Sequence, residues 1–247
     1  MTGRFVADAT ERGEQVVYLG WRGAERARRD LCRVDDWGSL LERRALRIEA
    51  VDIAGDGLES LQPARLVDSF RRSALDARRS GFAGLRLVGD ATEIVSTPRG
   101  REVYLELDQR LERLMADGLG ITAVCSLDMS ALDESIPIEV ACVHPATSTA
   151  LAPFVFHASP GGRFRLAGEV DWWNGDQLER ALSRVVDGAE GIEVDVSDLE
   201  FIDHRSLLGL DRWAVDHDCT LTLAGSRGVA ARLAGLVTLD RVVVRRG

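Results

Sequence analysis

VDVSDLEFIDHRSLLGL, residues 194–210, joins an apolar strand to a helix through a short polar turn. We expect the strand at Ile192–Val196, the turn at Ser197–Asp203 and the helix from about Arg205 to Val215. Asp203 stands where an N-cap carboxylate accepts hydrogen bonds from the first free N–H groups of a helix, and the helix dipole adds to this stabilisation. A phosphate at the same helix end would be stabilised for the same reason. The stretch therefore predicts a strand–turn–helix unit of an α/β domain.

The sequence around this unit continues the alternation of strands and helices. Short apolar runs predict strands at Gly162–Gly168, Thr220–Ala224 and Arg241–Val244. Amphipathic periodicity predicts helices at Gly175–Val186 and Ser226–Ala234. This alternation of short strands and helices within about 100 residues predicts a small α/β sandwich.

The first half of the chain shows the β-α-β pattern of a largely parallel sheet. Expected strands are Gln15–Gly20, Leu46–Val51, Gly84–Val88 and Ile121–Ser126, and expected helices are Gly23–Arg33, Pro63–Ser80 and Pro98–Asp117. The prolines fit first helical turns, and Gly81 and Gly118 fit helix C-termini. From Pro145 to Gly162 the composition shifts to Pro, Ser, Thr and Gly, so we place a domain boundary near residue 150.

The second domain, residues 151–247, resembles the STAS domains of anti-sigma-factor antagonists. The likeness rests on residues 194–210, on FRLAGEVD at 164–171 and on LAGS at 223–226. In that family a Ser in the turn is phosphorylated by an anti-sigma kinase, and the added charge breaks docking with that partner. Here His204-Arg205-Ser206 replaces the usual Ser-Ser-Gly, so Arg205 stands at the phosphoacceptor position. Ser206 is either a displaced phosphoacceptor or, with Asp203, only part of the helix cap.

The resemblance implies a docking face made by Asp203, His204, Arg205 and Ser206 for an anti-sigma factor or related regulatory protein. Arg205 near a helix N-terminus is unfavourable for the dipole, which favours a surface use such as pairing with an acidic partner or an acidic neighbour. Trp172 and Trp173 cannot both face one core, so we expect at least one to be exposed or in an interface. The simpler interpretation is that they pack between domains or across a homodimer, and the more specific one is that they dock on a partner protein.

The first domain, residues 1–150, resembles MEDS domains, sensory modules related in fold to RecA-like proteins. GFAGLRLVGDA at 81–91 carries most of the likeness, while the family's opening segment and first helix are missing or degenerate. The resemblance implies a RecA-like parallel-sheet domain that senses a small molecule or a partner. The fold class is thus α/β throughout.

Polar residues at the ends of the predicted strands are candidates for a ligand site in the first domain. Asp90 and Glu93 follow the third strand at the carboxyl edge, where open α/β sheets bind ligands, although they could equally cap the next loop. His144 would line a pocket with Cys125 and Asp128, or be an ordinary hydrogen-bonded histidine.

Several chemistries lack the residues they need. The chain has no Lys and no GxxxxGK[ST] motif, so we expect no ATPase activity. As an alternative function, the turn Gly20–Glu25 would bind a phosphorylated cofactor, although such glycines more often only permit a tight turn. We find no HExxH, GxSxG or metal-ligand spacing, and expect no catalytic residue, metal or cofactor.

Charge, targeting signals and cysteine spacing limit the classes of partner and the cellular compartment. The formal net charge of −9 disfavours direct nucleic-acid binding. We find neither a signal peptide nor an apolar membrane span, which predicts a cytoplasmic protein without membrane contact. Cys32, Cys125, Cys142 and Cys219 are far apart and are expected to be reduced, buried thiols. Together with these patterns, the resemblances to STAS and MEDS domains imply a non-enzymatic bacterial signalling protein.

Overall fold

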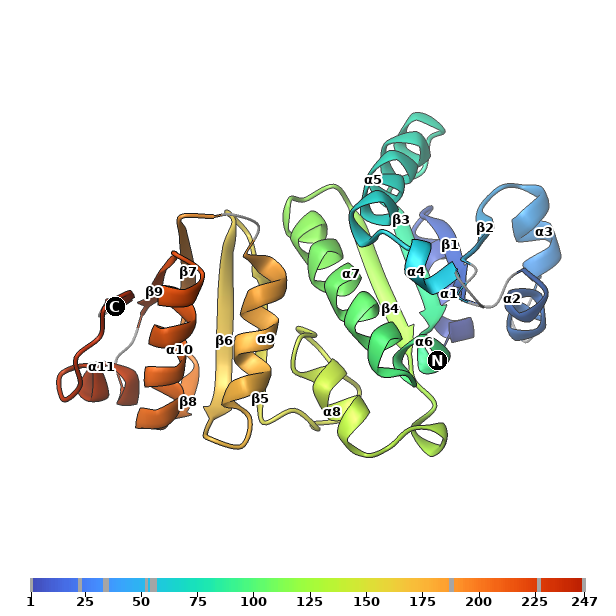
Figure 1. Ribbon diagram of the computed structural model, residues 1–247. Helices are drawn as coiled ribbons and strands as arrows, with labels where there is room; N and C mark the ends of the chain where they lie inside the picture. The colour runs from blue at the N-terminus through green and yellow to red at the C-terminus, as the bar shows by residue number, and fades with distance from the viewer. Residues whose placement is uncertain are drawn as a thin grey trace. The chain divides into compact units, whose positions relative to one another are not determined.

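The computed structural model describes residues 2–21, 24–32, 36–51, 53, 57–186, 189–225 and 228–245. Its internal contacts divide the chain into two compact units, Met1–Asp133 and Glu134–Gly247 (Figure 1). The boundary near residue 150 stays a prediction. In the structure α8 (Ser135–Ala141) and Cys142 belong to the second unit, where the carbonyl of Cys142 accepts a hydrogen bond from Phe156 N–H at 2.7 Å.

The first unit is built on a parallel sheet with the strand order β2-β1-β3-β4. The strands are β1 (Gln15–Gly20), β2 (Leu46–Ala50), β3 (Leu85–Asp90) and β4 (Ile121–Ser126). All three pairings are parallel. The predicted α/β class and the four strands of the first domain are confirmed, with shifts of one or two residues at some ends.

Helices connect these strands. They are α1 (Thr2–Glu11), α2 (Ala24–Leu31), α3 (Trp37–Glu42), α4 (Gly57–Ser60), α5 (Pro63–Arg79), α6 (Thr92–Val95) and α7 (Pro98–Ala116). Pro63 and Pro98 lie in the first turns of α5 and α7, as predicted, and Thr97 Oγ1 caps α7 by accepting from Gly100 N–H at 3.1 Å. Gly81 and Gly118 follow these two helices with φ of 89° and 77°, which favours glycine.

The two faces of the sheet are covered by different helices. Val16 and Tyr18 of β1 pack with Ala27 and Leu31 of α2 in one apolar cluster. Cys125 points to the opposite face, because side chains alternate along a strand, and there it contacts Tyr104 of α7. Helix α2 therefore covers one face of the sheet, and helix α7 covers the opposite face.

The helix α1 corrects the expectation that the first helix is missing or degenerate. Its Asp8 carboxylate lies 2.6 Å from the guanidinium of Arg86 on β3, and the same guanidinium bonds the Glu14 carboxylate. Arg86 also stands over the Phe5 ring, with 4.6 Å between Cζ and the ring centroid. A buried cation on the sheet thus contacts α1, whose Val6 and Ala9 are also buried in the apolar cluster beside β1.

The second unit contains a mixed sheet with the strand order β10-β9-β7-β6-β5, and β8 pairs with β6 beside β7. The strands are β5 (Phe154–Ser159), β6 (Arg163–Val170), β7 (Gly191–Asp195), β8 (Leu199–Ile202), β9 (Thr220–Ala224) and β10 (Val242–Val244). β5 is antiparallel to β6, and the other pairs are parallel. β5 lies in the segment expected to be a linker, and β8 lies in the expected turn, so both were missed.

Among the described residues of the second unit, three further helices are present: α9 (Gly175–Val185), α10 (His204–Asp216) and α11 (Val229–Ala234). All three were predicted, although α11 begins three residues later than expected. Trp213 Nε1 of α10 donates to Ser183 Oγ of α9 at 2.8 Å, which fixes the two helices side by side. The carboxylate of Asp211 accepts from the backbone N–H groups of Asp240, Arg241 and Val242 and so holds the start of β10.

The cysteines depart in part from the prediction. All four are free thiols, and Cys142 and Cys219 are buried, but Cys32 is exposed and Cys125 is partly accessible. Cys32 follows the last residue of α2, where its thiol donates to the Arg29 carbonyl at 2.8 Å.

Candidate functional site

A cavity of about 180 Å³ opens at the carboxyl edge of the first sheet. Its lining residues come from the ends of β1 and β3, from α2, from the start of α6 and from the segment after β4: Tyr18, Leu19, Gly20, Trp21, Ala27, Asp90, Thr92, Glu93, Asp128 and Ala131. The chain passes from β1 to β2 on one side and later to β3 on the other, so the cavity lies at the point where the strand order reverses. Open α/β sheets bind ligands in this crevice.

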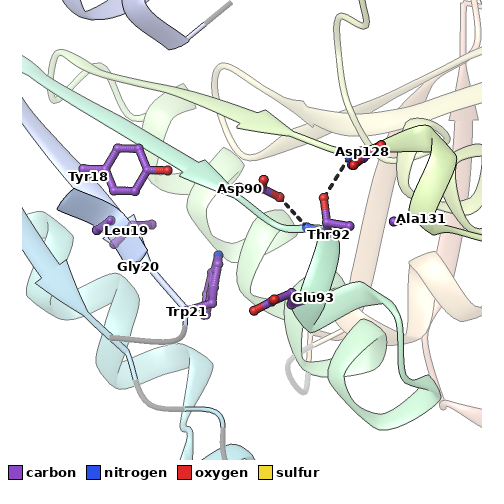
Figure 2. Close-up of a pocket in the computed structure, with 10 residues that line it drawn as sticks. Tyr18, Leu19, Gly20, Trp21, Asp90, Thr92, Glu93, Asp128 and Ala131 are labelled. Carbon is purple, nitrogen blue, oxygen red and sulfur yellow. Dashed lines mark hydrogen bonds between the residues drawn. The ribbon is translucent and has the colours of Figure 1, made fainter. Parts of the chain in front are cut away.

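Short hydrogen bonds join the loops that follow β3 and β4. Asp90 Oδ1 accepts from Thr92 N–H at 2.9 Å, and Thr92 Oγ1 accepts from Asp128 N–H at 2.8 Å (Figure 2). Asp128 in turn accepts from the hydroxyl and the N–H of Ser130, and these bonds lower the pKa of its carboxyl. Asp128 is therefore an anion at neutral pH, fixed at the rim of the cavity.

The aromatic side of the cavity is supplied by Tyr18 and Trp21, which are both buried. Figure 2 shows the Tyr18 hydroxyl turned towards Asp90 and the Trp21 ring beside Glu93. The Trp21 indole meets Tyr104 edge to face, with 6.4 Å between ring centroids. Gly89 faces Leu19 closely, since a Cβ there would lie 3.3 Å from Leu19 Cβ, whereas its distance of 3.7 Å from Trp21 Nε1 would be an ordinary contact.

The four predicted ligand residues do not form one site. Asp90 and Glu93 line the cavity, together with Asp128, but Cys125 is not among its lining residues. Part of Cys125 is accessible, yet its thiol is desolvated and lies near Asp108, so its pKa rises to about 12 and the thiol stays neutral. His144 belongs to the second unit, where its Nδ1 lies 2.8 Å from the Val140 carbonyl.

The turn proposed for anion binding is described only in part. Gly20 and Trp21 end β1 and line the cavity, and Ala24 and Glu25 begin α2. Arg22 and Gly23 lie outside the described residues. Tyr18 was not predicted as a site residue, and Trp21 was included only as part of this turn with no role for its ring, because aromatic side chains at a strand end resemble core.

The second candidate site is the start of α10. Asp203 is its N-cap, because Oδ1 accepts from Ser206 N–H at 2.7 Å. Oδ2 accepts from Trp172 N–H at 2.9 Å, so the same carboxylate holds the turn between β6 and α9. Burial alone would raise the pKa of Asp203, but hydrogen bonds from Ser206 and Trp172 outweigh it and leave the pKa below the usual value. The capping role argued from the sequence is present in the geometry.

The neighbours of Asp203 differ in accessibility. His204 and Arg205 are exposed, whereas Ser206 is 5% exposed. The Ser206 hydroxyl faces the start of α9, and a Cβ on Gly175 would lie 3.1 Å from it. A kinase would reach this hydroxyl only if the start of α10 opened.

Trp172 and Trp173 form an exposed aromatic pair beside this helix start. They are 53% and 77% exposed, and their ring centroids are 3.8 Å apart. The sequence predicted that at least one of them would be exposed, and the structure confirms this for both. We call the set Trp172, Trp173, His204 and Arg205 the docking surface.

Comparison with family models assigns most of the chain, although the first match extends past the first unit and includes α8. Residues 1–145 match the MEDS model, described as the MEthanogen/methylotroph, DcmR Sensory domain. The chain belongs to the MEDS family. Residues 155–245 match a second model, described as Mlab, STAS domain, so a STAS domain follows the MEDS domain. No curated protein and no solved structure matches the chain.

The two candidate sites lie in different family domains. The cavity lies in the MEDS sensory domain, and the docking surface lies in the STAS domain. Within the part of the chain that the structure describes, no helix is long and apolar enough to cross a membrane. In the same residues, no group of three or more His, Cys, Asp or Glu side chains is placed to hold a metal ion.

Proposed function

We propose that this protein is a regulatory protein whose MEDS domain senses a small molecule and whose STAS domain docks on a partner protein through the docking surface. The partner in this proposal is an anti-sigma factor or a related regulator. The match to a sensory domain followed by a STAS domain favours signalling over catalysis.

The observation that carries the proposal is the exposed tryptophan pair tied to the start of α10. Large apolar side chains standing together in solvent mark interaction sites. Trp and Arg are also the residues most enriched where binding energy concentrates in interfaces. Trp173 and Arg205 both project into solvent, and Asp203 fixes their two segments to each other.

Arg205 supports a docking role because it opposes local stability. A cation in the first turn of a helix faces the positive end of the helix dipole. Replacing it with Glu should stabilise α10 by about 0.5 kcal/mol. A residue that costs stability at an exposed position is best explained by what it binds, here an acidic partner surface.

Phosphorylation of Ser206 has less support than docking. The hydroxyl is buried against α9, so the proposed regulation comes from ligand binding to the MEDS domain instead.

The test is a pull-down from lysate of the source cell with wild type, Trp173→Ala, Arg205→Glu and the control Arg212→Glu. Arg212 is exposed on the same helix, two turns beyond the docking surface. We expect wild type and Arg212→Glu to retain an anti-sigma factor or its kinase, identified by mass spectrometry, and the two docking variants to lose it. Failure of wild type to retain such a protein, or equal retention by all four, would reject the partner assignment.

Gel filtration of the same proteins tests a homodimer. If wild type is a dimer and Trp173→Ala is a monomer, the tryptophan pair joins two copies of this chain, and the docking proposal is wrong for that pair.

A further inference from the structure

The cavity of the MEDS domain carries information about the charge of its ligand. Three carboxylates line it, from Asp90, Glu93 and Asp128, and none of the described residues that line it is basic. Asp128 is ionised, because Ser130 lowers its pKa by donating two hydrogen bonds. An anion entering this cavity would meet like charge in a partly desolvated site, which is unfavourable.

The aromatic residues favour the opposite charge. Trp is the best aromatic partner for a cation, and Tyr also serves. Trp21 is held in place by its edge-to-face contact with Tyr104, so it needs little ordering when a ligand binds. Figure 2 shows carboxylates and aromatic rings on facing sides of the same space, with Glu93 beside Trp21 and Asp90 opposite the Tyr18 hydroxyl.

The size of the cavity restricts the ligand to a small molecule. Its volume is about 180 Å³, and a dry cavity of about 150 Å³ is known to accommodate benzene. A nucleoside triphosphate is far larger and carries several negative charges. The described residues also hold no group placed to bind a metal ion, which leaves an organic cation as the fitting class.

We propose that the MEDS cavity binds a small organic ammonium ion, with the charged nitrogen among Asp90, Glu93 and Asp128 and the alkyl part against Trp21 and Tyr18. The inference rests on the proposed sensory function of this domain. The three carboxylates select the charge, and the rings and the cavity volume select the size.

The test is thermal denaturation of the full-length protein with matched probes. Choline and propylammonium are the cations, and each is paired with a neutral isostere: 3,3-dimethylbutan-1-ol, in which carbon replaces the charged nitrogen of choline, and 1-propanol, in which a hydroxyl replaces the ammonium group of propylammonium. ATP is the anionic probe. A ligand that binds the folded state raises Tm by mass action, so we expect at least one cation to raise Tm in a concentration-dependent way, with no shift from its isostere or from ATP.

Variants of the lining residues test whether the rise in Tm comes from binding in the cavity. Glu93→Gln and Asp128→Asn each remove one charge with little change of shape and should weaken the apparent Kd for the cation by about tenfold. Glu11→Gln, an exposed acid on α1 outside the cavity, is the control and should bind like wild type. Two variants are used so that a loss of folding in one, visible as a lowered Tm without ligand, leaves the other as the readout.

Each alternative outcome overturns the inference. An equal shift with the neutral isostere would show that charge is not recognised, and a shift with ATP alone would favour the anion-binding turn at Gly20–Glu25. No shift with either cation, or a shift that Glu93→Gln and Asp128→Asn both retain, would also reject it. None of these results affects the pull-down experiment. A wrong ligand class can therefore be distinguished from a wrong regulatory function.

Discussion

Asp203 joins two segments of the STAS domain through one carboxylate, and its replacement has a calculable cost. Oδ1 accepts from Ser206 N–H at 2.7 Å and caps α10, while Oδ2 accepts from Trp172 N–H at 2.9 Å and holds the turn before α9. Asp203→Ala removes both bonds. Loss of an N-cap costs about 1 kcal/mol. Loss of the second, charge-assisted bond costs about 1 kcal/mol more, because the exposed Trp172 turn regains water.

We therefore expect Asp203→Ala to lower the free energy of unfolding of the STAS domain by about 2 kcal/mol. Asp203→Asn provides a finer test, because an amide has one acceptor oxygen where a carboxylate has two. It should retain the cap, lose the Trp172 bond and cost about 1 kcal/mol. Arg205→Glu should not destabilise the domain, which separates the structural role of Asp203 from the docking role of Arg205.

The measurements are urea unfolding followed by circular dichroism and hydrogen exchange of the amides of residues 204–216. With a typical urea dependence for a small domain, the midpoint of Asp203→Ala should fall by about 1–2 M. Exchange should accelerate most at the start of α10. If Asp203→Ala matches wild type in both measurements, the carboxylate does not hold these segments and the docking surface is not fixed as described.

Three further predictions concern stability. Asp211→Ala leaves the buried N–H of Val242 without an acceptor and should lower the free energy of unfolding by about 2–4 kcal/mol. The control is Asp216→Ala, an exposed position on the same helix, which should change the urea midpoint little. Similar urea midpoints for the two variants would contradict this prediction. Arg86→Met removes the buried guanidinium from the Glu14 carboxylate, while Asp8 keeps its ion pair with Arg12, so the first domain should be destabilised, and hydrogen exchange should localise the loss to α1. Because hydrogen bonds to Asp203 and Asp211 outweigh their burial and lower their pKa in the folded state, the stability that these two carboxylates contribute should be fully present above about pH 5 and be lost as the pH falls through their folded pKa values; a urea midpoint that stays level from pH 5 down to pH 3 would refute this.

Periodicity in the sequence predicted most of both sheets because their strands are short apolar runs between Gly, Pro and polar residues. β1 (Gln15–Gly20), β4 (Ile121–Ser126) and β9 (Thr220–Ala224) agree with the prediction residue for residue. β8 was missed because its residues, LEFI, lie inside a segment that the turn pattern already explained. Its pairing with β6 is a tertiary contact that periodicity cannot show.

The site was predicted only where residue type alone indicated it. Asp90 and Glu93 are polar residues at a strand end, so their place at the carboxyl edge followed from general rules for α/β sheets. Trp21 and Tyr18 are apolar or amphipathic residues that equally fit a core, and only the strand order brings them beside Asp90 and Glu93. The tie between Asp203 and Trp172 spans 31 residues and depends on the pairing of β6 with β8.

The contact between α1 and Arg86 has a consequence for synthesis of the chain. Phe5 and Arg86 are 81 residues apart, and the Phe5 carbonyl accepts a bond from the Arg86 guanidinium at 3.3 Å. On the ribosome, α1 is made well before its anchoring cation, which emerges only after β1 and β2. During this interval the apolar side of α1 has no sheet to cover it, and the nascent chain is open to chaperones and to misfolding. Slowing translation just before β3 should therefore lengthen the period in which the first domain is most vulnerable.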